Sequence, residues 1–122
     1  MSFQKTIVDV YMEGFRRGDH GAILDCLTDD VTWLIAGYTT KRGKEAFDSE
    51  IVNDDFEGLP TLAVNRVVEE GDTVVAIGEG RATHRTNGEF RFAFSDVFVF
   101  RGKLIERVES YITPLGGESP AA

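Results

Sequence analysis

Residues 90–100 read FRFAFSDVFVF, and every second residue of this segment is a phenylalanine except Asp96. Alternation with a period of two is typical of a β-strand, whose successive side chains point to opposite faces. Five phenylalanines on one face predict that this face is buried, and Asp96 lies among them. A carboxyl group in such surroundings is costly unless it has a partner or a function. This strand therefore predicts both a sheet with a buried face and a candidate site.

The opposite face of the same strand is also mostly apolar. It carries Ala93, Ser95, Val97 and Val99, and Leu104 and Val108 join it if the last strand alternates regularly. A monomer does not normally expose such a face to water. We therefore expect a homodimer that forms through the convex face of the sheet.

The remaining pattern places helices before strands. Three helices are expected: the first at 4–17, the second after Asp19 and running through Leu27, and the third at 43–53. Strands are expected at 31–37, 62–70, 73–84, 90–100 and 104–113. Gly18 is expected to end the first helix, and Asp19 to cap the second. Asn87-Gly88 is a strong hairpin signal, whereas residues 53–60 indicate a loop.

This order predicts the α+β class, with four or five antiparallel strands. A strongly curved sheet wrapped over helices would form a cone with a closed end and an open mouth, which is a natural pocket for a small ligand. The length of 122 residues suits a single domain, expected at 1–115 with a flexible tail at 116–122.

Composition excludes several classes of function. The net charge of −8 argues against binding to nucleic acid or to anionic membranes. With no signal-peptide pattern and no membrane-spanning run, we expect a cytoplasmic protein. Two histidines, His20 and His84, and the single Cys26 form no metal-ligand set of usual spacing. No phosphate-binding or dinucleotide-binding fingerprint is present, so neither a metal nor a cofactor is expected.

Several other residues are candidates for the pocket. Tyr11 lies on the apolar stripe of the first helix, where a core tyrosine is the simpler interpretation. His84 follows Gly78 and Gly80 on one strand face; these glycines leave room for a ligand, although His84 is equally well explained as a half-exposed residue at a hairpin. The expected lining residues are Trp33, Ile35, Tyr38, Phe92, Phe94, Phe98 and Tyr111.

Arg107, Glu109 and Tyr111 are expected to share one face of the last strand. One of them could pair with Asp96. Arg107 and Glu109 could equally form a structural ion pair at the rim of the cone, which is the interpretation we favour.

The run from Tyr11 through Gly18-Asp19 to LTDDVTW, the segment SDVFVFRGK and the order of elements resemble a known superfamily. It is the nuclear transport factor 2-like and SnoaL-like superfamily, which contains ketosteroid isomerase, polyketide cyclases and limonene epoxide hydrolases. The resemblance covers residues 5–113 and implies the cone-shaped fold. It also implies that Tyr11 and Asp96 match the pair that donates hydrogen bonds to the substrate oxyanion in ketosteroid isomerase. The general-base position of that enzyme falls on Ile35, which carries no proton.

Two functions remain open. The first is a cofactor-free isomerase, cyclase or hydratase acting on a small, apolar, carbonyl-bearing molecule, in which Tyr11 and Asp96 polarise the oxygen and His84 or water handles the proton. The second is a non-catalytic binding module or a dimerisation domain. If neither His84 nor Glu109 faces the pocket, binding is favoured.

Overall fold

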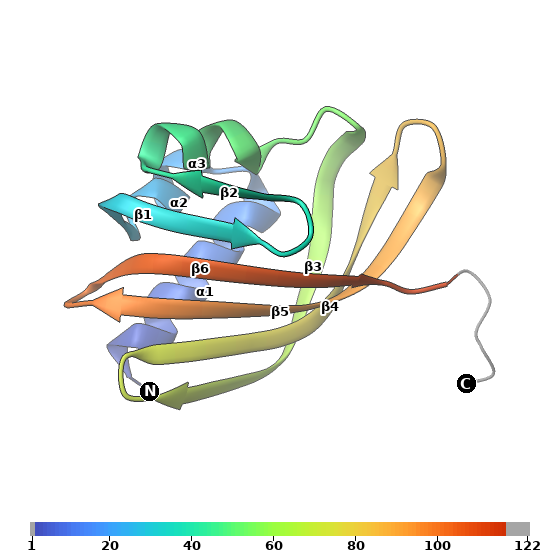
Figure 1. Cartoon of the computed structure of the whole chain (residues 1–122). Coiled ribbons are helices and arrows are strands. Elements are labelled where there is room, and N and C mark those ends of the chain that lie inside the picture. Colours follow the sequence, from blue (N-terminus) through green and yellow to red (C-terminus); the bar gives the residue numbers. More distant parts are fainter. Residues whose placement is uncertain (1, 117–122) are drawn as a thin grey trace.

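The computed structural model describes residues 2–116, so residues 117–122 of the expected tail lie outside the described residues (Figure 1). Its elements are α1 (Phe3–Arg17), α2 (His20–Leu24), β1 (Leu27–Ile35), β2 (Thr39–Arg42), α3 (Lys44–Ile51), β3 (Phe56–Glu70), β4 (Thr73–His84), β5 (Gly88–Arg101) and β6 (Leu104–Pro114). The predicted α+β class is confirmed. In the described residues, no helix is long and apolar enough to cross a membrane.

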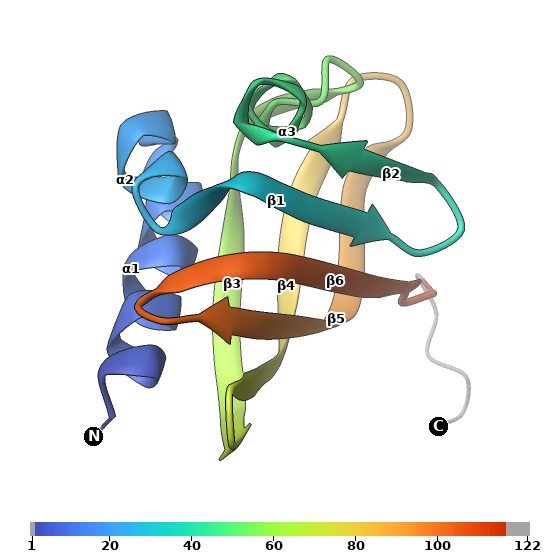
Figure 2. The same cartoon turned by 60° about the vertical axis from the view of Figure 1, so that its left-hand side comes forward.

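Six strands form one sheet in the order β2-β1-β6-β5-β4-β3. Neighbouring strands are antiparallel except β1 and β6, which are parallel. The expectation of four or five antiparallel strands was therefore incomplete, because it missed β2 and the parallel pair. Figures 1 and 2 show that the long strands bend and that the sheet wraps around α1, as expected for a cone.

Local signals set the ends of the first two helices. The Ser2 side chain accepts a hydrogen bond from the Lys5 N–H at the start of α1. Gly18 ends α1 in the left-handed conformation with φ of 66°, which glycine adopts without steric cost. The Asp19 side chain caps α2 by accepting from the Ala22 N–H. The predicted roles of Gly18 and Asp19 are confirmed.

The structure corrects three element boundaries. Helix α2 ends at Leu24 rather than Leu27, because Leu27 already pairs with Ile105 in the sheet. Strand β1 accordingly starts four residues earlier than expected and includes Asp29 and Asp30. Residues 56–60 belong to β3 instead of a loop; the pairing of β3 with β4 is interrupted between Glu57 and Thr61, next to Pro60. An irregularity of this kind is where a strand tolerates proline.

The predicted buried face of β5 is confirmed. Phe92, Phe94, Phe98 and Phe100 are all at most 8% exposed and pack in one core with α1. Gly78 and Gly80 on β4 face this core, but they leave no room for a ligand. A Cβ atom at Gly80 would lie 2.5 Å from Cζ of Phe92, and one at Gly78 would lie 2.9 Å from Cζ of Phe94. The phenylalanine rings therefore fill the space that the glycines leave.

Candidate functional site

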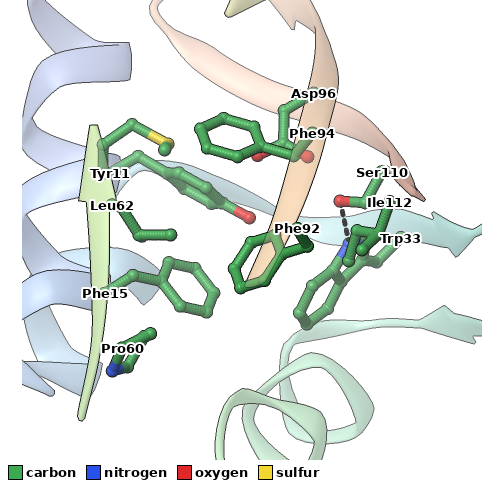
Figure 3. Close-up of a pocket in the computed structure, with 11 residues that line it drawn as sticks. Tyr11, Phe15, Trp33, Pro60, Leu62, Phe92, Phe94, Asp96, Ser110 and Ile112 are labelled. Atoms are coloured by element: carbon green, nitrogen blue, oxygen red, sulfur yellow. Dashed lines mark hydrogen bonds between the residues drawn. The ribbon is translucent and has the colours of Figure 1, made fainter. Parts of the chain in front are cut away.

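A cavity of about 170 Å³ lies between α1 and the concave face of the sheet, and we call it the inner cavity (Figure 3). Helix α1 and strands β1, β3, β5 and β6 all contribute to its wall. The lining residues are Tyr11, Met12, Phe15, Trp33, Pro60, Leu62, Phe92, Phe94, Asp96, Ser110 and Ile112. Only a few polar groups reach an otherwise apolar interior, which is the usual composition of a small-molecule pocket.

Tyr11 supplies a neutral hydroxyl to this cavity. Its ring is 2% exposed and packs against Phe15 and Phe98, with ring centroids 5.1 and 4.9 Å away. Burial, followed by the charges of Asp96 and Cys26, raises the pKa of Tyr11 well above its ordinary value. Figure 3 shows the hydroxyl pointing into the cavity, and no partner for it is present among residues 2–116. Tyr11 therefore has a hydrogen bond to offer to a ligand.

Asp96 is the only carboxyl group that lines the inner cavity in the described part of the chain. Burial raises its pKa from 3.8 to about 6, and a hydrogen bond from the Ser110 hydroxyl opposes this rise. The side chain is half-buried and belongs to the cavity wall. Asp96 can therefore change its protonation state near neutral pH, which an ordinary surface aspartate does not do.

Ser110 connects Asp96 to the indole of Trp33. Ser110 and Asp96 are directly paired residues of β6 and β5. The Ser110 oxygen accepts a hydrogen bond of 2.9 Å from Nε1 of Trp33, and this bond is buried. Ser110 thereby lies next to both Trp33 and Asp96, and sequence analysis did not find this arrangement.

A β-bulge explains why Ser110 was missed. The pairing of β5 with β6 shifts between Val99 and Phe100, so that Ile105 and Arg107 face neighbouring residues of β5. A shift of one residue moves every later side chain to the other face. As a result Val108 is buried in the core, not on the outer face where regular alternation placed it.

The same shift turns Arg107, Glu109 and Tyr111 outward. Nε of Arg107 donates to Glu109 over 2.7 Å, and the Tyr111 hydroxyl donates to Glu109 over 3.0 Å. The hydrogen bond from Arg107 is the main cause that lowers the pKa of Glu109. None of the three lines the inner cavity, which differs from the expectation that Tyr111 contacts a ligand. The alternative of a structural ion pair between Arg107 and Glu109 is the one present in the structure.

The other candidate residues are placed apart from the inner cavity. Nδ1 of His84 accepts 3.1 Å hydrogen bonds from the N–H groups of Thr86 and Asn87, so this histidine shapes the hairpin between β4 and β5. Tyr38 is 67% exposed in a turn. Ile35 and Phe98 pack in or against the core without lining the cavity. The structure thus brings together Tyr11, Trp33, Phe92, Phe94 and Asp96 from the predicted set.

A second cavity of about 250 Å³, the outer cavity, adjoins the inner one. The two share Phe15, Pro60, Phe92 and Ile112 as lining residues. The wall of the outer cavity also includes His20 and residues 51–53 at the end of α3, none of which sequence analysis singled out. The candidate site is therefore longer than a single pocket.

Within residues 2–116, the structure holds no group of three or more histidine, cysteine, aspartate or glutamate side chains placed to bind a metal ion.

Comparisons with known proteins agree with the fold. The sequence profile of the SnoaL-like domain family matches residues 8–108. A search of curated proteins gives no match. Among solved structures, an NTF2-like protein of unknown function from Burkholderia pseudomallei is 24% identical with a TM-score of 0.85, covering 93% of this chain and 92% of that one.

Two further solved structures carry names that refer to small molecules. A protein from Xanthomonas campestris that bears the name polyketide cyclase is 26% identical with a TM-score of 0.81, and 89% of each chain is covered. TerC, co-crystallised with polyporic acid, is 23% identical with a TM-score of 0.81, covering 92% of each chain. All three structures are similar to this chain over nearly its full length.

Proposed function

Since this chain belongs to the SnoaL-like domain family, we propose that its inner cavity binds a small, mostly apolar molecule through a carbonyl oxygen. The observation that carries the proposal is the Tyr11 hydroxyl, neutral and without a partner among the described residues, next to Asp96 in an apolar cavity. Tyr11 donates one hydrogen bond to the carbonyl oxygen, and Asp96 in its protonated form donates a second. The co-crystallisation of TerC with an organic acid supports small-molecule binding in this fold.

Binding is favoured over catalysis because the two other candidate proton acceptors are directed elsewhere. His84 is engaged in a hairpin, and Glu109 is paired with Arg107 on the outer face. A second function, cofactor-free proton transfer, is supported by one observation: the pKa of Asp96 is about 6, which suits a general acid or base. The name of the Xanthomonas campestris protein is compatible with either function.

The ketone 4-phenylbutan-2-one tests the proposal. Trp33 is the one tryptophan of the chain and lines the inner cavity, so its fluorescence reports binding. We expect Tyr11→Phe to weaken ketone binding about 5- to 10-fold at about pH 6, since it removes one hydrogen bond and keeps the ring. Butylbenzene, which has no oxygen, is the matched ligand and should bind both proteins alike.

Equal ketone affinity in the two proteins would contradict the role of Tyr11. The same sample in heavy water separates binding from catalysis, because a catalyst exchanges hydrogen for deuterium at the carbons next to the carbonyl group. Hydrogen–deuterium exchange that is faster than in buffer and disappears in Asp96→Asn would favour proton-transfer catalysis over binding alone.

We also propose that the outer face of the sheet forms a homodimer. Val75, Ile77, Ala93, Val97 and Val99 share this face on β4 and β5, and each is only half-buried. A stable interface buries on the order of 1,600 Å² in total. Sedimentation velocity at micromolar concentration should show a dimer, and Val97→Lys should shift it to a monomer because it places a charge in an apolar contact. A parent protein that sediments as a monomer would remove this proposal.

A further inference from the structure

The outer cavity has one polar end, formed by two helices. His20 is the first residue of α2, Asp48 belongs to α3, and Nδ1 of His20 lies 2.6 Å from Oδ1 of Asp48. His20 lines the outer cavity, whereas Asp48 is not part of its wall. The carboxylate thus contacts the imidazole from outside the cavity and fixes the orientation of the ring.

This pairing leaves the second ring nitrogen of His20 for a ligand. An Nδ1–H that donates to Asp48 makes Nε2 the acceptor of a neutral imidazole. No hydrogen-bond partner of Nε2 is present in the part of the chain that the structure describes. The side chains of the pair are 38% and 45% exposed, and a contact this exposed contributes little to stability. Nε2 of His20 is thus the ring nitrogen left for a ligand.

A nearby amide extends the polar end. Oδ1 of Asn53 accepts a hydrogen bond of 2.9 Å from the Asp55 N–H, which leaves the amide NH₂ of Asn53 as a donor. Asn53 lines the outer cavity together with His20, and most of the other lining side chains are apolar. The outer cavity consequently carries one acceptor, on His20, and one donor, on Asn53, and a hydroxyl group is a ligand group that can pair with either.

We propose that the two cavities form one site for an elongated, neutral hydroxy-ketone, with the carbonyl group at Tyr11 and Asp96 and a phenol or enol hydroxyl at His20. This inference rests on the proposed function of the inner cavity. Phe15, Pro60, Phe92 and Ile112 line both cavities, so the two lie side by side. The helical rise from Tyr11 to Gly18, which lines the outer cavity, is about 10 Å, a length that one ring and a short chain match.

Charge favours a neutral hydroxyl over a carboxylate at this end. The net charge of the chain is −8, and Asp48 adjoins His20 directly. A carboxylate on the ligand would therefore meet repulsion from the Asp48 carboxylate behind the ring.

Three ketones with the same phenylbutanone skeleton test this proposal: 4-(4-hydroxyphenyl)butan-2-one, its methyl ether and 4-phenylbutan-2-one. Trp33 fluorescence gives the affinities at one fixed pH. The hydroxy-ketone should bind the parent protein about 10-fold more tightly than 4-phenylbutan-2-one, and the methyl ether should lose most of this advantage because it cannot donate. In His20→Phe the ratio of the affinity for the hydroxy-ketone to that for 4-phenylbutan-2-one should fall to about two or less. Asp48→Asn should reduce the ratio partially, because the ring loses its orienting carboxylate.

Histidine labelled with ¹⁵N gives a readout that needs no variant. Nε2 of His20 should shift when the hydroxy-ketone binds and stay unchanged with 4-phenylbutan-2-one. His84, which lines neither cavity, is the internal control, and His84→Gln should keep the parent affinity ratio.

The outcomes separate the two proposals. If no ketone binds, the proposed function of the inner cavity fails. If the ketones bind with equal affinity, or the His20 resonance does not respond, the carbonyl site stands and the role of His20 is overturned. If the hydroxy-ketone binds more tightly but the His20 resonance does not shift, the ligand is oriented with its phenol at Tyr11. This outcome also overturns the role of His20.

Discussion

Between about pH 7.5 and about pH 4.5, the free energy of unfolding of the parent protein should rise by about 2 kcal/mol relative to that of Asp96→Asn. The cause is the carboxyl group of Asp96, whose pKa burial raises from 3.8 to about 6 in the folded state. The folded protein therefore binds the proton of Asp96 more tightly than the unfolded chain does. The resulting stabilisation is fully present below about pH 3.8 and is lost as pH rises through about 6. The full difference corresponds to about 3 kcal/mol, most of which falls between the two chosen pH values.

Urea unfolding at several pH values measures this effect. Taking the difference from Asp96→Asn cancels the other titrating groups, since asparagine keeps the shape of the side chain and does not ionise. Asp9→Asn, on the exposed surface of α1, controls for the loss of one negative charge. Carbon-detected NMR of the Asp96 carboxyl group should give a midpoint near 6. A difference that stays constant with pH, together with a midpoint near 4, would mean that Asp96 is solvated or paired and would remove its role as a donor.

Gly78→Ala should destabilise the protein by about 3 kcal/mol or more, since it forces an atom into a filled space. A Cβ atom at Gly78 would lie 2.0 Å from the carbonyl oxygen of Ala63. That oxygen belongs to the backbone of β3, which pairs with β4 at this point, so it cannot move without disturbing the sheet. The same strand carries Leu62 and Pro60 in the wall of the inner cavity. Loss of the pairing would therefore also open the site.

Gly21→Ala is the matched control, with an effect of opposite sign. Gly21 lies in α2, and the nearest atom to its added Cβ is Oδ1 of Asp19 at an ordinary 3.7 Å. Alanine in a helix is more favourable than glycine by up to about 1 kcal/mol, so this variant should be slightly more stable than the parent. Chemical denaturation of both variants checks the pair. Gly78→Ala with parent-like stability would mean that β3 and β4 pack less closely than described.

The sequence determined the features that depend on neighbouring residues. Alternation in residues 90–100 placed Asp96 on the buried face with the phenylalanines, because the period of a strand is local. Gly18 and Asp19 marked the boundary between α1 and α2, since capping needs only a few residues. The order of elements, together with the resemblance, was enough for the cone-shaped fold.

Tertiary structure decided what lies opposite what. The bulge in the pairing of β5 and β6 turned Ser110 inward to Asp96 and turned Glu109 and Tyr111 outward. No local pattern in residues 104–113 announces that bulge, because it is a property of two paired strands. His20 and Asp48 are 28 residues apart, and only the packing of α2 and α3 beside the cavity makes them neighbours. Periodicity assigns a side chain to a face, whereas its partner depends on register and packing between distant segments.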